Sequence, residues 1–326
     1  MLAAESSQFS SLLLAADITL IDKAVIIMVF ALPLIIAFIV GLVIGSLSNV
    51  VIYRLVYFRS IWSPPSHCPR CRNEIPWHDN IPIISWLLLR GRCRFCKGPI
   101  PLKYPIIELI SGLLYAGIMY RFLYAPHFPV ERLEDLNRVM SHFENIGTTV
   151  FLFKAYLFAT FLLILATIDI DHQLLPNSLT ITGAVIGLAL SPFNLPNSGD
   201  VFPVDPFGAI WEIAPALDSF FQSLLGMLVG GGVIFLIFLI GFLIYKFAAM
   251  GIGDIKLAGM IGAFVGLKMI GPALFVGFVA GGVFGIILII LKVAGLRSLI
   301  PFGPYLCLGG LVAMLWGPNL VKLWLG

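Results

Sequence analysis

The sequence predicts an all-α membrane protein that crosses the bilayer about eight times and carries one metal-binding loop. The chain has 326 residues, of which 60% are hydrophobic and only 11% are charged. Soluble domains carry about 25% charged residues, so this composition excludes a soluble protein. Apolar stretches of roughly 20 residues, the length that a membrane helix needs, recur along most of the chain. Four of the five cysteines fall in one long polar segment, which indicates a metal site there.

The N-terminal part divides into a lead-in, one span and a polar loop. Residues 1–23 are expected to be an extracytoplasmic lead-in, because they lack the basic start of a signal peptide. The first membrane helix is expected at 24–46 and the polar loop at 47–104. That loop contains nine lysines and arginines against two acidic residues, which predicts a cytoplasmic location by the positive-inside rule. The arginines could equally serve a ligand directly.

The remainder, 105–326, reads as a bundle of membrane helices. The expected spans are 105–124, 149–168, 177–190, 219–247, 255–267, 272–291 and 305–321. The connections 125–147 and 191–218 are rich in acidic residues and are expected outside. Lys292 and Arg297 are expected inside. This alternation gives about eight spans and places both termini outside.

Two aspartates at the edges of apolar stretches are the candidate catalytic residues. Asp169 follows the apolar run 149–168, and Asp254 stands in the segment 250–256 beside another apolar stretch. Ionisable groups at membrane depth are costly and mark functional sites. The alternation of spans returns both carboxylates to one membrane face, so we expect a proteolytic pair. One carboxylate would take a proton from a water while the other, protonated, polarises the scissile carbonyl.

Asp171 is expected to support this pair rather than to belong to it. Positions two apart on a helix point about 200° away from each other, so Asp169 and Asp171 cannot share one water. Asp171 also stands beside His172 and nearer to water. A structural explanation remains open for Asp169, because aspartate favours helix ends as a cap.

The segment around Asp254 contains three further candidate residues. Gly251 and Gly253 are expected to let the backbone turn and a substrate strand approach closely. Lys256 is either an inside-positive residue or a cation that keeps Asp254 ionised. The alternative for this GxGD segment is a turn at the end of a helix.

The cysteines form two CxxC pairs with the spacing of a zinc knuckle. Cys68 and Cys71 make the first pair, and Cys93 and Cys96 make the second about twenty residues later. Four thiolates close a tetrahedral shell and leave no open position, so the zinc would be structural. It would also supply folding energy to a loop that can bury little core. The rival interpretation is a redox dithiol pair. Cys307 lies in an apolar run and is expected to be a packing residue.

The chain resembles the bacterial type IV prepilin peptidases in three segments. Along the sequence these are the tetracysteine loop, the segment D-x-D-x-x-x-LPN and the segment GxGDxK. The resemblance covers nearly the whole chain from about Gly45. In that family the pair is the first aspartate of the D-x-D segment and the aspartate of GxGD, which implies Asp169 and Asp254 here. Asn177 departs slightly from the family, in which aspartate is common at that position.

The resemblance implies two activities for one GxGD-type intramembrane aspartic protease. The family cuts the basic leader of prepilins and pseudopilins after a glycine, then methylates the new N-terminal residue with S-adenosylmethionine. In that family the tetracysteine loop is associated with methylation and binds zinc. A glycine linked to methylation stands two positions before the third cysteine, which implies Gly91 here. Asn49, Arg54 and Glu108 are the expected contacts for methylation. The implied setting is the bacterial inner membrane, with a role in type IV pilus assembly or type II secretion and no nucleic acid as partner.

Two functions of other classes remain open from the residues alone. An ion-coupled transporter with a zinc-stabilised loop would also place carboxylates in a membrane. Such a transporter would more often show inverted repeats and charges at the midplane, and the sequence shows neither. A zinc-anchored scaffold without chemistry would leave the aspartates unexplained.

Overall fold

The computed structural model describes residues 20–57, 65–124, 146–193, 215–245, 251–293 and 301–325. Within these ranges the chain is helical, with two isolated β-bridges and no β-strand. The predicted all-α fold class is therefore confirmed for this part of the chain. Most of the predicted lead-in, most of the two predicted external connections and Arg297 lie outside the described residues.

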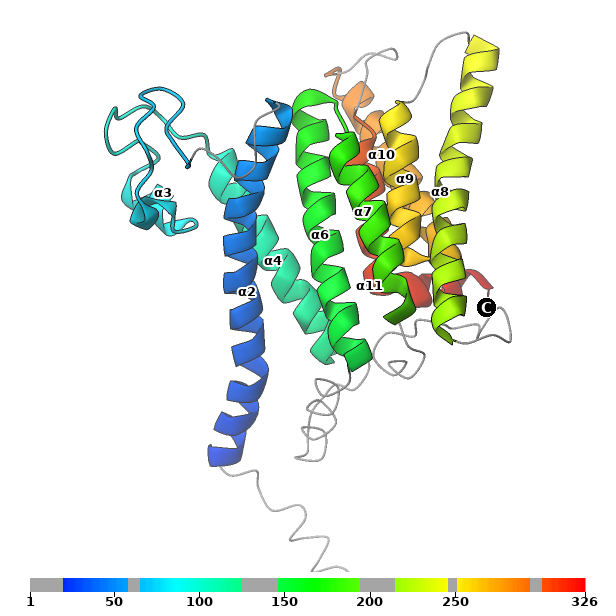
Figure 1. Ribbon diagram of the computed structural model, residues 1–326, viewed down its shortest axis with the longest axis horizontal. Coiled ribbons are helices and arrows are strands. Elements are labelled where there is room, and N and C mark those ends of the chain that lie inside the picture. The colour runs from blue at the N-terminus through cyan, green and yellow to red at the C-terminus, as the bar shows by residue number, and fades with distance from the viewer. Residues whose placement is uncertain are drawn as a thin grey trace, which may run out of the picture.

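Eight longer helices in the described ranges correspond to the expected spans. They are α2 (Leu20–Val56), α4 (Lys103–Tyr124), α6 (Ile146–His172), α7 (Asn177–Leu190), α8 (Pro215–Tyr245), α9 (Ile252–Val265), α10 (Leu267–Ile290) and α11 (Gly303–Leu325). Successive helices run in alternate directions (Figure 1). Among the described residues four helices, α2, α6, α8 and α10, are long and apolar enough to cross a membrane, while α7 and α11 contain shorter apolar segments. The number of about eight spans stays a prediction.

Helix α2 is longer than the expected first span. It continues past Ser46 to Val56, so residues 47–56 belong to this helix and not to a loop. No glycine or proline interrupts 47–56, and the Asn49 side-chain amide donates to the Tyr104 carbonyl oxygen at 3.1 Å. The added turns therefore pack against the start of α4 and carry polar residues to the cysteine loop.

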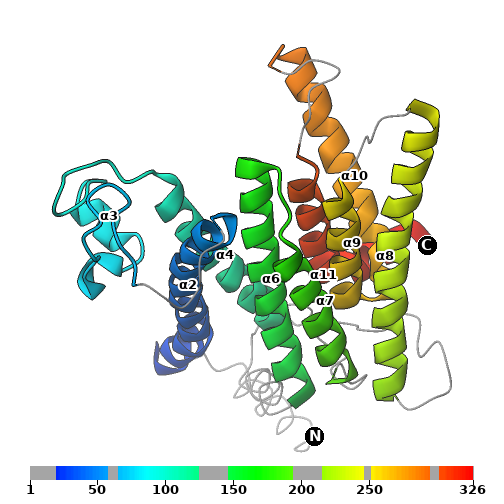
Figure 2. The same cartoon turned by 45° about the horizontal axis from the view of Figure 1, so that its top comes forward.

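The helices form a bundle with the cysteine loop on one side. Helix α2 packs along α4, α8 along α9, and α10 along α11, while α6 contacts α2, α4, α7 and α11. The loop, with the 3-10 turn Trp77–Asn80 and the short helix α3 (Ile84–Leu88), lies on the side of α2 and α4 away from the bundle (Figures 1 and 2). Phe158, Leu165 and Ile168 of α6 are fully buried. This buried face of α6 leads directly to Asp169.

Candidate active site

Asp169 lies in the last turn of α6 and points into the bundle. The residue is 5% exposed, whereas Asp171 in the same turn is exposed. The main-chain N–H of Gly303, the first residue of α11, donates to Asp169 Oδ2 at 3.0 Å in a buried hydrogen bond. Helix α11 therefore begins at the carboxylate of Asp169.

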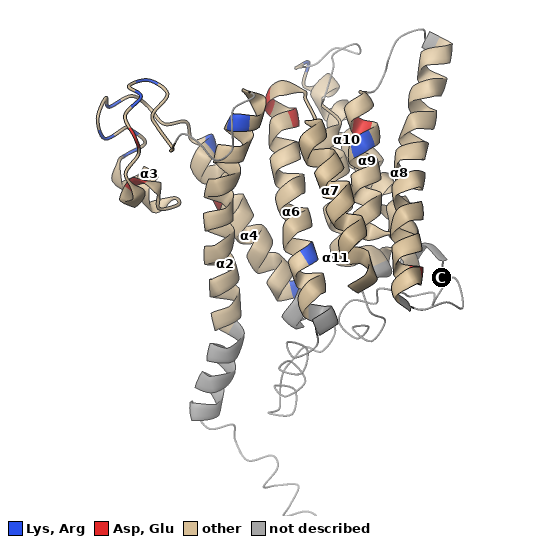
Figure 3. Ribbon diagram, viewed as in Figure 1, with Lys and Arg blue, Asp and Glu red and all other residues tan. Residues whose placement is uncertain are grey.

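Asp254 lies in the first turn of α9 and is also buried, at 8% exposed. Its Oδ2 accepts the N–H of Gly251 at 3.2 Å, and its own N–H donates to the Gly251 carbonyl oxygen at 3.1 Å. Gly253, next to Asp254, packs against Leu175 in the connection that follows Asp169, and helices α9 and α11 are in contact. The two aspartates thus share one site beside α11, at the end of the bundle where Figure 3 shows acidic residues on α6 and α9.

The connection between α6 and α7 packs against the start of α9. A Cβ atom at Gly253 would lie 2.9 Å from the Cβ of Leu175, so only a glycine permits this approach. The Lys256 ammonium donates to Asn177 Oδ1 at 2.7 Å. The described contact of Lys256 is therefore with the start of α7. It holds together the two chain segments that carry the aspartates.

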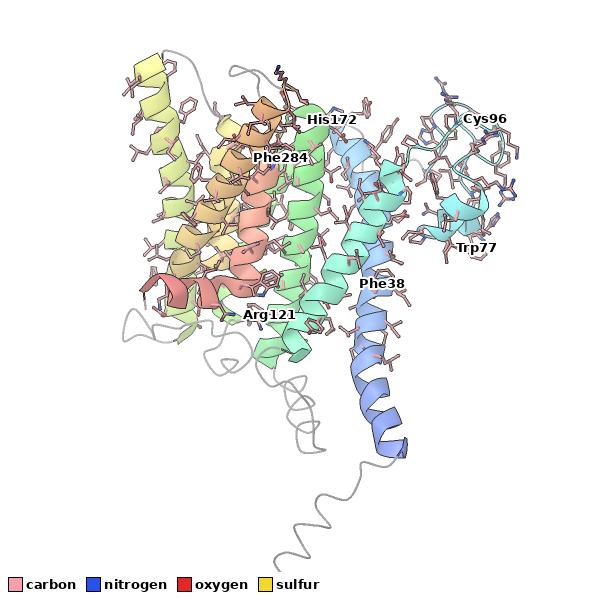
Figure 4. All side chains as sticks on the ribbon, turned by 180° about the vertical axis from the view of Figure 1, so that it is seen from behind. Phe38, Trp77, Cys96, Arg121, His172 and Phe284 are labelled. Atoms are coloured by element: carbon pink, nitrogen blue, oxygen red, sulfur yellow. The ribbon has the colours of Figure 1, made fainter. Side chains whose placement is uncertain are left out.

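The start of α4 is joined to the end of α6 by an ion pair. Lys103 Nζ lies 2.9 Å from Asp171 Oδ2, with side chains 47% and 30% exposed. Figure 4 shows His172 at the same end of the molecule as Cys96 of the loop, with Arg121 at the opposite end. Asp171 is therefore a link between the cysteine loop and the aspartate site.

The four cysteines converge on one point of the loop. Their sulfur atoms all lie within 4.8 Å of one another, with Sγ–Sγ distances of 3.9 Å for Cys68 and Cys96 and 4.0 Å for Cys71 and Cys93. A tetrahedral zinc site with Zn–S bonds of about 2.3 Å needs sulfur atoms about 3.8 Å apart. The donor set and its spacing fit a zinc ion.

Each CxxC pair lies in a turn of the same form. The Cys68 N–H donates to the Asn73 carbonyl oxygen at 2.9 Å, and the Cys93 N–H donates to that of Gly98 at 2.8 Å. The residue after each pair, Arg72 or Lys97, has a positive φ of 60° or 55°. A hydrogen bond from the Cys96 N–H lowers the pKa of the Cys93 thiol to about 7. A thiolate, the form that binds metal, is thus available near neutral pH.

Gly91 lies at a tight turn before the second pair. Its φ is +66°, and a Cβ atom there would lie 2.9 Å from the ring of Trp86. The Trp86 indole N–H donates to the Ile100 carbonyl oxygen at 3.1 Å, and the Ile100 N–H donates to that of Gly91 at 2.7 Å. Gly91 therefore fixes the ring of Trp86 and the segment around Ile100 that closes the second turn.

A cavity of about 670 Å³ lies between this loop and helices α2 and α4. Asn49 and Arg54 of α2 and Glu108 of α4, the three expected methylation contacts, all line it. Gly91 is not in the wall, but Trp86, against which it packs, is. Tyr53, Tyr104, Glu74, Asp79 and Arg94 also contribute to the wall.

Acidic groups of this cavity are held by defined partners. The Glu108 carboxylate is buried and accepts the N–H of Ile83 at 2.7 Å. Ile83 has a positive φ of 59°, which is rare for a β-branched residue. Arg94 donates through Nε to Asp79 at 2.6 Å and holds the pKa of that carboxyl below its usual range. The cavity thus contains carboxyl groups in fixed positions beside aromatic rings.

Comparison with known proteins finds two family matches and several relatives. The bacterial peptidase A24 N-terminal domain matches residues 39–122, and the type IV leader peptidase family matches residues 156–286. The chain is 30% identical to a prepilin leader peptidase/N-methyltransferase of Stutzerimonas stutzeri, over 89% of this chain and 92% of that protein. The chain belongs to the type IV leader peptidase family.

Two further members of the family are similar to most of this chain. A Pseudomonas aeruginosa protein of the same name is 30% identical over 87% of this chain and 91% of its own length. A Myxococcus xanthus protein of that name is 33% identical over 78% of this chain, which spans 62% of that relative. No solved structure matches this chain significantly.

The two family matches divide the chain as the geometry does. The N-terminal match contains nearly all of α4, the cysteine loop and the walls of the cavity, and the second match contains both Asp169 and Asp254. The structure brings the predicted aspartates to one site, the cysteines to a second and the methylation contacts to one cavity.

Sequence reasoning missed three groups around the aspartates of this family member. They are the N–H of Gly303, the ammonium of Lys103 and the side chain of Asn177 as the partner of Lys256. A signal for the first exists in the segment 301–304, because proline is common in the first turn of a helix. The other two are polar residues next to motifs, which no pattern in the chain distinguishes.

Proposed function

We propose that this protein removes the basic leader peptide of type IV prepilins or pseudopilins at a membrane face. It then methylates the new N-terminal residue, usually phenylalanine. The observation that carries the proposal is the meeting of Asp169 and Asp254 in one buried site within a member of the leader peptidase family. The role would lie in type IV pilus assembly, in type II secretion, or in both.

The aspartate pair performs the cleavage. Both carboxylates are buried, and two like charges held close together resist double ionisation. The ionised member takes a proton from a water, whose oxygen attacks the carbonyl carbon of the scissile bond. The protonated member gives its proton to the carbonyl oxygen, which forms a tetrahedral intermediate. As this intermediate collapses, the proton taken from the water passes to the leaving nitrogen, a hydroxyl proton returns to the other aspartate, and the amine is released. No covalent enzyme intermediate is needed.

The surroundings of the pair support this chemistry. Asp169 accepts an N–H at the start of α11, and Asp254 accepts one at the start of α9. The N-terminus of a helix stabilises negative charge, so both helices favour the ionised member of the pair. Gly251, Gly253 and Lys256 position Asp254, while Asp171 positions the end of α6 through Lys103.

The cysteine cluster holds a structural zinc ion. Cys68, Cys71, Cys93 and Cys96 supply four thiolates, which fill a tetrahedral shell and leave no position for a substrate. The described loop has short hydrogen-bonded turns and exposed apolar side chains such as Trp77, at 81%. The metal therefore provides the folding energy that the small core of this loop lacks.

The cavity beside the loop is the proposed site for S-adenosylmethionine. When bound, this cofactor supplies an electrophilic methyl group on a positively charged sulfur. A volume of about 670 Å³ lies in the range of small-molecule sites. The Glu108 carboxyl group and the rings of Tyr53, Trp86 and Tyr104 suit a cation. Asn49 and Arg54 would orient the polar ends of the cofactor.

The two sites are proposed to face the cytoplasm from the bacterial inner membrane. The prepilin's apolar helix would enter the bilayer, while its basic leader stays at the anionic leaflet. The Lys103–Asp171 contact places the start of α4, which borders the cavity, beside the turn that carries Asp169. A new N-terminus would thus be released next to the methylation site. The ion-coupled transporter finds no support in the relatives.

A synthetic prepilin peptide tests both activities in one experiment. The purified protein, in lipid nanodiscs with S-adenosylmethionine, should cut the peptide after its glycine and add one methyl group, read by mass spectrometry. Asp169→Asn and Asp254→Asn should each abolish cleavage, because an amide cannot exchange the proton. An uncut peptide with the unmodified protein, or full cleavage by both variants, overturns the proposal.

A further inference from the structure

The first residue of α11, Gly303, lies against the carboxylate of Asp169. The Gly303 N–H donates to Oδ2 at 3.0 Å, and the two residues are 134 positions apart in the chain. A Cβ atom built on Gly303 would lie 2.6 Å from Oδ2 and 3.0 Å from Cγ of Asp169. Real Cβ atoms essentially never approach within 3.0 Å, so a side chain at Gly303 displaces the carboxylate.

The requirement for glycine at this position is steric. Among the described glycines, positive φ angles occur at Gly91 and Gly266, so the backbone of Gly303 is one that other residues adopt. What a side chain would meet is the carboxyl group itself. The third atom nearest to this Cβ also belongs to Asp169, since it is the Asp169 Cβ at 3.4 Å.

We infer that Gly303 is a positioning residue for the peptidase, because its N–H fixes the Asp169 carboxylate against the start of α11. The inference rests on the proposed aspartic peptidase function and adds a third chain segment to its site. Asp254 receives the equivalent N–H from Gly251 in its own helix, so its position is set locally. Asp169 lies at the end of α6, where the free groups of the helix are carbonyls and not N–H donors. Its donor therefore comes from another helix.

This arrangement has a chemical consequence for the pair. The partial positive charges at the starts of α9 and α11 both act on the same two carboxylates. The pair can then retain one negative charge in a buried setting, where an unpaired carboxylate would otherwise be neutralised. The Gly303 N–H also fixes the position of Asp169 Oδ2, and with it the rotamer of the side chain. Displacement of reacting groups by about 1 Å costs about 100-fold in rate.

Gly303→Ala in the full-length protein tests the inference. The kcat for cleavage of the prepilin peptide should fall about 100-fold. KM should stay within about threefold, because Gly303 contacts Asp169 and not the expected path of the leader. Gly282→Ala in α10 is the matched control, since a Cβ there meets nothing within 4 Å, and it should cleave as the wild type does. A Gly303→Ala protein with wild-type kcat overturns the inference.

A stability cycle keeps the test valid even if Gly303→Ala is poorly folded. The Tm of the purified protein is compared for wild type, Gly303→Ala, Asp169→Ala and the double variant. The alanine at 169 removes the carboxyl atoms at 2.6 and 3.0 Å, so Gly303→Ala should lower Tm clearly in the wild type and much less in the Asp169→Ala background. Equal losses in both backgrounds, including failure to accumulate in both, overturn the inference.

The outcomes separate this inference from the proposed function. If Asp169→Asn and Asp254→Asn both keep cleaving, the peptidase assignment fails and the role of Gly303 fails with it. If both are inactive and Gly303→Ala is fully active, only the inference about Gly303 fails. Methylation of a pre-cut peptide should be unchanged in Gly303→Ala, and its loss alongside cleavage would mean a general defect and overturn a role specific to Asp169.

Discussion

The substitution Gly91→Ala should separate methylation from cleavage. A residue other than glycine at the φ of +66° costs about 1–3 kcal/mol, which is a factor of about 5 to 150 in the population of the native turn. The new Cβ would also lie 2.9 Å from the Trp86 ring. Trp86 lines the cavity and donates a hydrogen bond to the Ile100 carbonyl oxygen. A shift of its ring would therefore alter both the wall of the cavity and the turn of the second CxxC pair.

Zinc retention and the two reactions should therefore respond differently to Gly91→Ala. Zinc should be lost to a competing chelator at least about tenfold more readily, and methylation of a pre-cut peptide should fall by a similar factor. Cleavage should stay within about twofold, because the described contacts of Gly91 all lie in the loop. Gly117→Ala in α4 is the control, since a Cβ there meets nothing within 4 Å. A parallel loss of cleavage and methylation, or unchanged methylation, would refute this reasoning.

Four further outcomes are expected. Asp171→Asn should reduce cleavage by no more than about fivefold, since its partly exposed ion pair with Lys103 contributes about 1 kcal/mol or less; peptide cleavage rates measure this. Cys68→Ser should lose the zinc, seen by elemental analysis, and methylate poorly while still cleaving. Asp254→Asn should methylate a peptide supplied already cut, which mass spectrometry detects, and failure would mean one shared site. Zinc affinity should fall as the pH drops from about 11, the pKa of Cys71, to about 7, the pKa of Cys93, and further below that value, because protons then compete for the thiolates.

The helical architecture and the two motifs were predictable from the sequence for physical reasons. Apolar runs and their bounding polar residues placed all eight longer helices, with the start of α7 at Asn177 as expected. Helix positions two residues apart point away from each other. This geometry correctly distinguished Asp169, which is buried, from Asp171, which is exposed. Both features depend on local periodicity, which a single sequence contains.

Contacts between distant segments were not predictable in the same way. Helix α2 ends ten residues later than the expected first span, because 47–56 packs on α4. Gly303 has no side chain and approaches Asp169 from a helix that starts 134 positions later. Which partner Lys256 selects depends likewise on where α7 begins in space. Such pairings follow from tertiary packing, which no local pattern records.

The packing between the two sites determines how the reactions can follow one another. Ile107, next to Glu108, and Ile168, next to Asp169, are buried in one apolar cluster together with Ile52 and Ile164. A close-packed interior of this kind does not deform gradually, so the cavity and the aspartate pair are held at a fixed separation. The freed N-terminus must therefore move to the methylation site. Since the amine exists only after cleavage, the order of the two reactions follows from the chemistry of the substrate and needs no conformational signal between the sites.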